Sequence, residues 1–238
     1  MNRLLKPFNF LLLLHFFNDG IKTTTIILLP FIAKELSISY TQVGILGSSF
    51  GLLALFLAIP TGIIASKIGG FKFLLAALLV YSLGVIGISI SPSLVLLIPV
   101  FYLTAIGFGV FHTVGFTLVA RTSTKENIGK NMANFTSTGD IGRLAISSLA
   151  LLIIPLLGWR LTAVILSCMG LFLYLTSKIT NTDNYKSNLG HVNLNENHED
   201  WLKSFLIILK TKKLFLVALT SFIDAFASNQ LFIFLPFL

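Results

Sequence analysis

Apolar runs of about twenty residues recur along the whole sequence, and the short segments between them hold most of the charged residues. A helix needs ~20 mostly apolar residues to cross ~30 Å of hydrocarbon, whereas the strands of a membrane barrel are about ten residues of alternating polarity. The length and continuity of the runs therefore predict membrane-spanning helices. We place seven of them, at residues 8–33, 43–65, 72–91, 94–119, 133–156, 160–178 and 214–238.

The composition supports an all-α polytopic membrane protein. Of the 238 residues 55% are hydrophobic and only 11% are charged, against roughly 25% charged in soluble domains, and the mean hydropathy is +0.90. The net charge is +8, but the basic residues lie between apolar runs rather than on one face of a domain, which argues against nucleic-acid binding. Cys168 is the sole cysteine and lies in an apolar run, so we expect neither a disulfide framework nor a thiolate metal site.

The loops differ sharply in basic residues, and this difference predicts the orientation. If the N-terminus is cytoplasmic, the outer loops hold only Lys34 and Arg160. Cytoplasmic loops of membrane proteins carry an excess of Lys and Arg. We therefore expect a multi-pass protein of the cytoplasmic (inner) membrane with a cytoplasmic N-terminus. The inner segments hold Arg3, Lys6, Lys67, Lys72, Arg121, Lys125, Lys130, Lys178, Lys186, Lys203, Lys210, Lys212 and Lys213.

One long polar stretch divides the chain. Residues 180–200 are rich in Asn and poor in apolar residues, which indicates a flexible cytoplasmic linker. Residues 201–213 mix apolar side chains with lysines, as in a short helix at the lipid surface. The predicted organisation is a six-span half at 1–178, a linker with an interfacial helix at 179–213, and a seventh span at 214–238.

The two ends of the chain resemble each other. Residues 15–30 and 222–236 both read Phe-x-Asp, then a polar patch, then an apolar run closed by proline. About six spans with their loops separate the two copies. We interpret the second copy as the beginning of a second half, so that the expected intact protein includes a C-terminal half missing from these 238 residues.

Five charged residues fall inside predicted spans: Asp19, Lys22, Asp140, Arg143 and Asp224. A charge in hydrocarbon costs several kcal/mol, so each of them is a candidate functional residue. Asp19–Lys22 and Asp140–Arg143 share the i, i+3 spacing that puts acid and base on one helix face, close enough to pair. Internal salt bridges that lock helices together are the alternative interpretation, which is harder to apply to Asp224 because no base lies one turn away.

The intramembrane polar residues suggest two roles. Burial disfavours the charged form of a carboxylate, which suits Asp19, Asp140 and Asp224 to proton exchange. Lys22 and Arg143 are candidates for holding an anionic group of a substrate, Arg as a planar fork and Lys as a point charge. Imidazole titrates in the physiological range, so the candidate substrate contacts also include His15 and His112. Hydrogen-bonded packing is the alternative for both histidines, although His15 stands one turn before Asp19, a spacing that allows the two side chains to form a short polar relay.

The sequence lacks the motifs of common enzymes and ATP-driven pumps. There is no HExxH and no G-x-x-x-x-G-K-[ST]. We therefore expect neither an enzyme nor a bound cofactor or metal, and the energy for any transport must come from an ion gradient or from the gradient of the substrate itself.

The loop between the second and third spans carries a family resemblance. It reads GIIASKIGGFK from Gly62 to Lys72, and resembles the G-x-x-x-D-R-x-G-R loop of the major facilitator superfamily, with Gly62, Lys67 and Gly69 matching and Lys72 near the second basic position. Ser66 stands where that family has an acid. The resemblance implies two six-span halves that rock against each other, and it assigns a conformational-switch role to this loop.

Two further matches point to one branch of that superfamily. Residues 15–19 read HFFND and residues 111–112 read Phe-His, similar to drug exporters of the fosmidomycin-resistance type. The resemblance implies a secondary active transporter, either symporter or antiporter, that moves a drug-like compound or organic anion across the bilayer by alternating access. Protons are the expected coupling ion, and efflux the expected direction. The alternative is a truncated remnant or membrane scaffold that does not transport.

Overall fold

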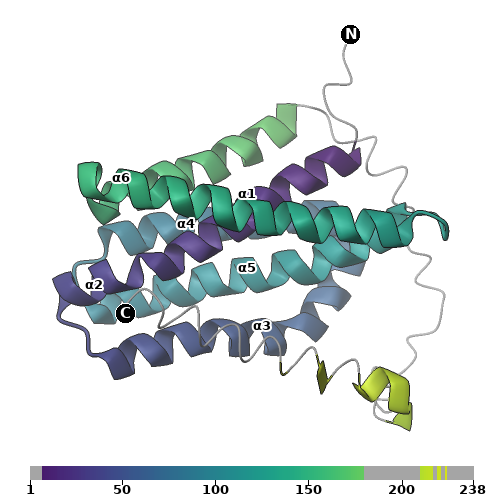
Figure 1. Cartoon of the computed structure of the whole chain (residues 1–238), viewed down its shortest axis with the longest axis horizontal. Helices are drawn as coiled ribbons and strands as arrows, with labels where there is room; N and C mark the ends of the chain where they lie inside the picture. The colour runs from purple at the N-terminus through teal and green to yellow at the C-terminus, as the bar shows by residue number, and fades with distance from the viewer. Residues whose placement is uncertain (1–6, 180–209, 217–218, 221–222, 224–238) are drawn as a thin grey trace.

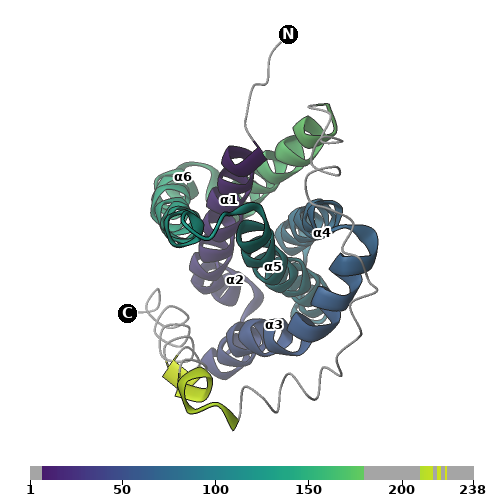
Figure 2. The same ribbon diagram turned by 90° about the vertical axis from the view of Figure 1, so that its right-hand side faces the viewer.

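The computed structural model describes residues 7–179, 210–216, 219–220 and 223, and this part of the chain is helical with short connections. Figure 1 shows the long helices running side by side along one axis, and Figure 2 shows them end-on as a bundle with α5 beside α1, α3 and α4. The bundle agrees with the predicted all-α fold. Its elements are α1 (Pro7–Ile27), α2 (Leu29–Leu36), α3 (Tyr40–Ile68), α4 (Gly70–Ile90), α5 (Leu94–Thr122) and α6 (Ile128–Ile179).

The first predicted span, 8–33, forms two helices rather than one. Pro30 has no amide hydrogen and stands in the first turn of α2, so the helix is interrupted at Leu28 between α1 and α2. Helical hydrogen bonds continue on both sides of the break, since the amide of Leu28 donates to the carbonyl of Thr24 at 2.9 Å and the amide of Ile32 donates to that of Leu28 at 3.0 Å. Helix α2 then continues to Leu36, where Ser37 adopts a left-handed conformation (φ 53°) and ends it.

The next three spans are confirmed as helices with small shifts at their ends. Helix α3 begins three residues earlier than predicted because Ser39 and Gln42 form a reciprocal capping box. The turn from α3 to α4 depends on Gly69, whose φ of 92° lies in a region that side chains disfavour. Helix α5 extends to Thr122, three residues past the predicted end of its span.

The fifth and sixth predicted spans are the two arms of α6. Gly158 has non-helical angles (φ 75°, ψ 162°) inside this 52-residue element, and Figure 1 shows the chain reversing direction there. Only glycine adopts such angles without strain, so Gly158 sets the point where the fifth span ends and the sixth begins.

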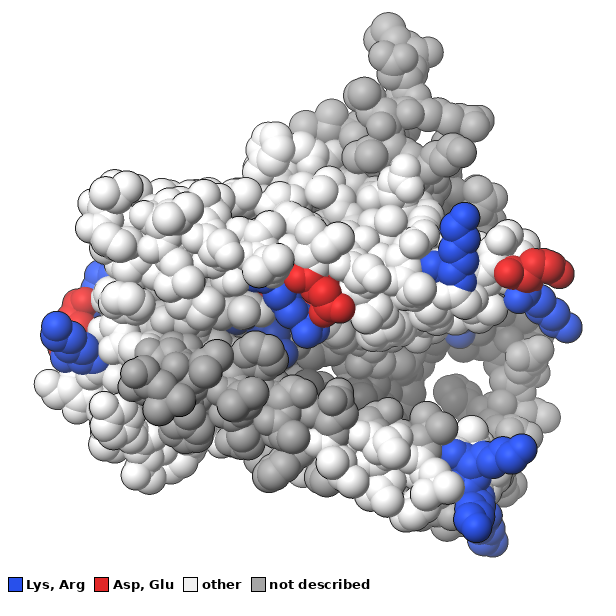
Figure 3. All heavy atoms as spheres, viewed as in Figure 1, with Lys and Arg blue, Asp and Glu red and all other residues white. Residues whose placement is uncertain are grey.

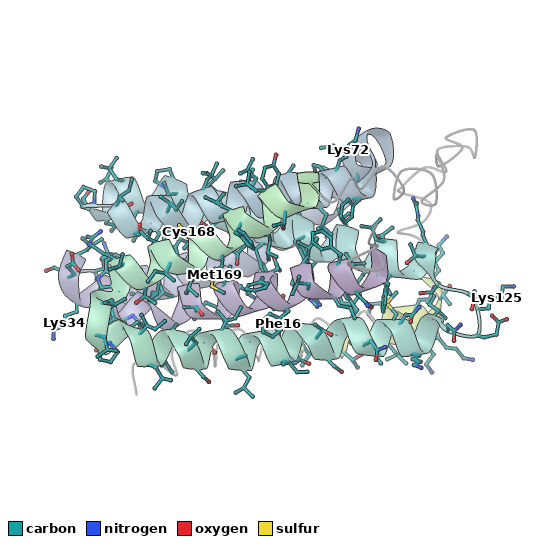
Figure 4. The ribbon with its side chains drawn as sticks, turned by 90° about the horizontal axis from the view of Figure 1, so that it is seen from above. Phe16, Lys34, Lys72, Lys125, Cys168 and Met169 are labelled. Atoms are coloured by element: carbon teal, nitrogen blue, oxygen red, sulfur yellow. The ribbon has the colours of Figure 1, made fainter. Side chains whose placement is uncertain are left out.

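Helices α1 and α6 approach closely because two glycines of α6 face α1. A side chain at Gly142 would collide with the carbonyl oxygen of Phe16, and a Cβ at Gly139 would lie 2.5 Å from Cε1 of His15. Figure 4 shows Phe16 on α1 beside the first arm of α6. Small residues let membrane helices pack backbone to backbone. This contact brings the polar residues of α1 within reach of those of α6.

Three helices of the described residues are long and apolar enough to cross a membrane: Gly70–Ile90, Leu94–Thr122 and Ile128–Ser177. Among the described atoms, the face in Figure 3 is largely white, and blue and red atoms gather at the two ends of the bundle and in one patch near its middle. Figure 4 places Lys34 at one end and Lys72 and Lys125 at the other, as the predicted alternation of loops requires. Which end faces the cytoplasm stays a prediction.

The predicted linker and seventh span lie largely outside the described residues. Residues 212–216 are helical and exposed, and they lie across the predicted boundary between the interfacial helix and the seventh span. Asp224 lies outside the described part, so its predicted role has no structural counterpart here.

Candidate functional site

Asp19 of α1 is the centre of a buried polar cluster. Its side chain is 1% exposed, and the guanidinium of Arg143, from the first arm of α6, holds one of its oxygens: Nη2 lies 2.6 Å and Nε 2.8 Å from Oδ2. Charge-assisted hydrogen bonds of this length are among the strongest in proteins. The pair links residues 124 positions apart, and it fixes α1 against α6.

The other oxygen of Asp19 faces two imidazoles. Nε2 of His112, from α5, lies 3.1 Å from Oδ1, and Nε2 of His15 lies 3.4 Å from the same atom. The amide nitrogen of Asn18 also donates to Oδ1, at 3.2 Å. The carboxylate therefore has nitrogen partners from three helices. A buried charge is tolerated when it is paired and hydrogen-bonded in this way.

The orientation of His15 is fixed by α6. Its Nδ1 lies 2.7 Å from the carbonyl oxygen of Phe135 and donates to it, and its ring stacks on the ring of Phe135 with centroids 3.9 Å apart. This hydrogen bond assigns the proton of a neutral His15 to Nδ1. The lone pair on Nε2 then points at Asp19 and His112, whose own Nε2 is 3.4 Å away.

The predicted pair Asp19–Lys22 is wrong. The i, i+3 spacing brings the two residues to one face of α1, but Arg143 and the histidines take both oxygens of Asp19. Lys22 turns to α5 instead, where its ammonium lies 4.3 Å from the ring centroid of Phe108. The predicted pair Asp140–Arg143 forms, with Nη1 of Arg143 3.4 Å from Oδ1 of Asp140. Arg143 is thus shared between a buried acid and an exposed one.

The cluster retains unused polar atoms. Among the described residues, Nδ1 of His112 and Oδ1 of Asn18 are buried without a hydrogen-bond partner. Buried polar atoms are normally paired, so such atoms at a site are open positions for a ligand or water. Arg143 is 42% exposed and His112 25% exposed, which leaves the cluster open on one side.

Sequence reasoning missed several residues that build this site. Asn18, Phe135 and Tyr81 were not singled out, although Tyr81 donates from its hydroxyl to the backbone oxygen of Asn18 at 3.2 Å. A phenol in the middle of an apolar run is the signal that was available for Tyr81. For Phe135 there was none, because its contact to His15 uses a backbone carbonyl.

A second polar cluster lies at one end of the bundle, where the predicted spans begin and end. Glu35 of α2 accepts hydrogen bonds from the indole of Trp159 at 2.6 Å and from Nε of Arg160 at 2.9 Å, and these donors hold the pKa of its carboxyl below the usual value. Arg160 also donates to the carbonyl oxygens of Ser89 and Ser91 at the end of α4. We call this the Glu35 clamp. It joins α2 and α4 to the second arm of α6 directly after Gly158.

The sequence pattern of the Major Facilitator Superfamily matches residues 11–238. The chain belongs to this superfamily. Its members are multi-pass membrane transporters, so the prediction that the chain is not an enzyme is confirmed. No curated protein matches the chain, and nothing supports one branch of the superfamily over another.

The loop that resembles the switch motif of the major facilitators lies at the α3–α4 turn. Gly69 ends α3 through its amide, which donates to the carbonyl of Ala65 at 3.0 Å, and Lys72 is exposed in the first turn of α4. Gly62 lies within α3, where no described atom approaches the position of a Cβ. The side chain of Lys67 lies outside the described residues. The conformational role of this loop stays a prediction.

Proposed function

We propose that this major facilitator is a secondary active transporter, and that the cluster around Asp19 binds its solute and couples transport to protons. The solute is a small organic anion or a drug-like compound with an anionic group. The observation that carries the proposal is the buried ion pair between Asp19 and Arg143, which joins α1 to α6 inside predicted membrane spans. A charged pair at such a position is costly, and in membranes it typically marks a substrate or proton pathway.

The contacts of Arg143 support a role in binding an anion. Its Nη2 and Nε are held by Asp19, whereas Nη1 faces only the exposed Asp140 at the longer distance of 3.4 Å. An anionic group of the solute competes with these carboxylates for the guanidinium. Nδ1 of His112 and Oδ1 of Asn18 offer polar contacts beside it.

The contacts of Asp19 support proton coupling. When Asp19 takes up one proton from the solution, its carboxyl becomes neutral and its hold on Arg143 weakens. The guanidinium then binds the solute, and release of the proton on the other side restores the ion pair and expels the solute. Asp140 and Asp224 remain further candidate proton carriers, and alternating exposure of the site occurs as the two halves of the fold rock against each other.

The test is solute flux in proteoliposomes under an imposed pH gradient, with a panel of organic anions and drug-like compounds. Arg143→Ala should abolish gradient-driven flux while insertion into the membrane is retained. Arg160→Ala is the matched control, because Arg160 is also an arginine paired with an acid but lies in the Glu35 clamp. Unchanged flux in Arg143→Ala, or no gradient-driven flux of any compound by the intact protein with both halves, would contradict the proposal.

A further inference from the structure

The three atoms of the cluster that face one another are two imidazole nitrogens and one carboxylate oxygen. Nε2 of His15, Nε2 of His112 and Oδ1 of Asp19 form a triangle with sides of 3.4, 3.1 and 3.4 Å. A tetrahedral ion with ligands at ~2.0–2.1 Å sets neighbouring ligand atoms about 3.3 Å apart. The triangle therefore has the size of one face of such a site.

The hydrogen bond of His15 to α6 places an electron-rich atom in this triangle. Because Nδ1 of His15 donates to the carbonyl of Phe135, Nε2 carries a lone pair directed at the Oδ1 of Asp19. Two electron-rich atoms 3.4 Å apart repel unless a positive charge lies between them. A proton on Nε2 of His112 supplies a partial positive charge there, since this nitrogen lies 3.1 Å from Oδ1 of Asp19 and 3.4 Å from Nε2 of His15. A metal ion in place of this proton supplies a larger one.

We propose that His15, Asp19 and His112 form a site for a divalent transition-metal ion of the Zn²⁺ type. Two histidines and one carboxylate, with a fourth position left open, are a common donor set for such ions. The surroundings of the ligands are also suitable. A histidine ligand typically donates its other ring nitrogen to a carbonyl, as His15 does to Phe135, and Arg143 holds the second oxygen of Asp19 and so fixes the carboxylate.

The charges around the cluster determine what fills the fourth position. The two negative charges of Asp19 and Asp140 balance the two positive charges of Arg143 and Lys22. The ammonium of Lys22 lies over the ring of Phe108, which packs against His112. A bound divalent ion therefore adds two positive charges to a neutral group of side chains. An anionic fourth ligand lowers this excess, and the exposed edge of His112 gives it a way in.

The inference concerns equilibrium binding and does not depend on transport. Failure to bind a metal would leave the proposed function unchanged, and failure to transport would leave the metal site unchanged. The experiment is a titration of the full purified chain with Co²⁺, followed by displacement with Zn²⁺, with an affinity tag that contains no histidine. The readouts are the visible absorption of Co²⁺ and the stoichiometry of binding.

We expect one Co²⁺ per chain with the intense visible bands of a tetrahedral ion, displaced by one equivalent of Zn²⁺. His112→Ala and Asp19→Asn should weaken binding at least tenfold. His112→Asn tests the same ligand without opening a cavity, and thermal unfolding of each variant separates lost binding from lost folding. His191 and His198 are the other two histidines of the chain, so the double variant His191→Asn/His198→Asn is the matched control and should bind as before.

Three results would overturn the proposal. In the first, the unaltered chain gives no Co²⁺ spectrum at millimolar metal. In the second, the unaltered chain and the folded His112→Asn variant bind the metal equally well. In the third, the double variant loses binding. The first would mean that the His112 proton alone fills the triangle, and the other two would place any metal elsewhere on the chain.

Discussion

Two ion pairs join distant parts of this bundle, and they bridge almost the same sequence distance in very different surroundings. Asp19–Arg143 lies among α1, α5 and α6, and Glu35–Arg160 lies at the end of the bundle where α6 turns back. The carboxylate of Asp19 is 1% exposed, whereas that of Glu35 is 48% exposed. Water therefore screens the Glu35 pair and is excluded from the carboxylate of Asp19.

The difference shows which pair is structural and which is a candidate for function. The Glu35 clamp completes the hydrogen bonding at the end of α4 and ties down the residue after the Gly158 turn, which is a structural role. The Asp19 pair lies where apolar residues would pack at no electrostatic cost. A buried ion pair is often no more stabilising than apolar residues of similar size, so stability alone does not account for it.

The largest difference should appear when each acid is replaced by its amide. Asp19→Asn leaves the guanidinium of Arg143 with only the exposed Asp140 as a partner, and we expect a loss of about 2–4 kcal/mol in the free energy of unfolding. Glu35→Gln should cost about 1 kcal/mol or less, because its pair is screened by solvent. Unfolding in mixed micelles by denaturant measures both. A larger loss from Glu35→Gln would reverse the comparison.

A smaller effect should follow when α1 and α6 are pushed apart. In Gly142→Ala the new methyl group meets the backbone of Phe16, which cannot move aside, and such overpacking costs about 1–3 kcal/mol. Gly62→Ala is the matched control, since no described atom lies within 4 Å of that Cβ. In Gly62→Ala the free energy of unfolding should stay the same or rise by up to about 1 kcal/mol, because alanine favours a helix more than glycine does. Equal destabilisation by the two variants would show that α1 and α6 do not pack this closely.

The smallest effect concerns the pH dependence of the Glu35 clamp. Hydrogen bonds from Trp159 and then Arg160 lower the pKa of Glu35, so the folded state favours the ionised form. Its contribution is complete above the pKa of the unfolded chain, near 4.5, and is lost as the pH falls through the lower folded value. Between the unfolded and the folded pKa of Glu35, the melting temperature should therefore fall less steeply with falling pH in Glu35→Gln than in the unaltered protein. An unaltered decline in the variant would exclude Glu35 as its source.

The sequence alone was sufficient to predict most of the helices and to single out the charged residues and histidines that meet at the site. Runs of apolar residues locate α3, α4, α5 and the arms of α6, and the cost of burying charge singles out Asp19, His15, His112 and Arg143. Local spacing failed to predict their partners. It paired Asp19 with Lys22, because the i, i+3 rule concerns one helix and contains no information about its neighbours. The true partner, Arg143, lies on α6, and Gly139 and Gly142 let α6 pack closely against α1. The Glu35 clamp was missed because it joins the end of α2 to the second arm of α6, and the meeting of these helices depends on the Gly158 turn.

The most direct test of the central claim compares two acid-to-amide variants in one transport assay. The full chain, Asp19→Asn and Glu35→Gln are reconstituted at equal density, and solute flux is measured under an imposed pH gradient. The account predicts gradient-driven flux for the full chain and for Glu35→Gln, and its loss in Asp19→Asn. Equal flux from the two variants would contradict the claim that the Asp19 cluster couples transport to protons.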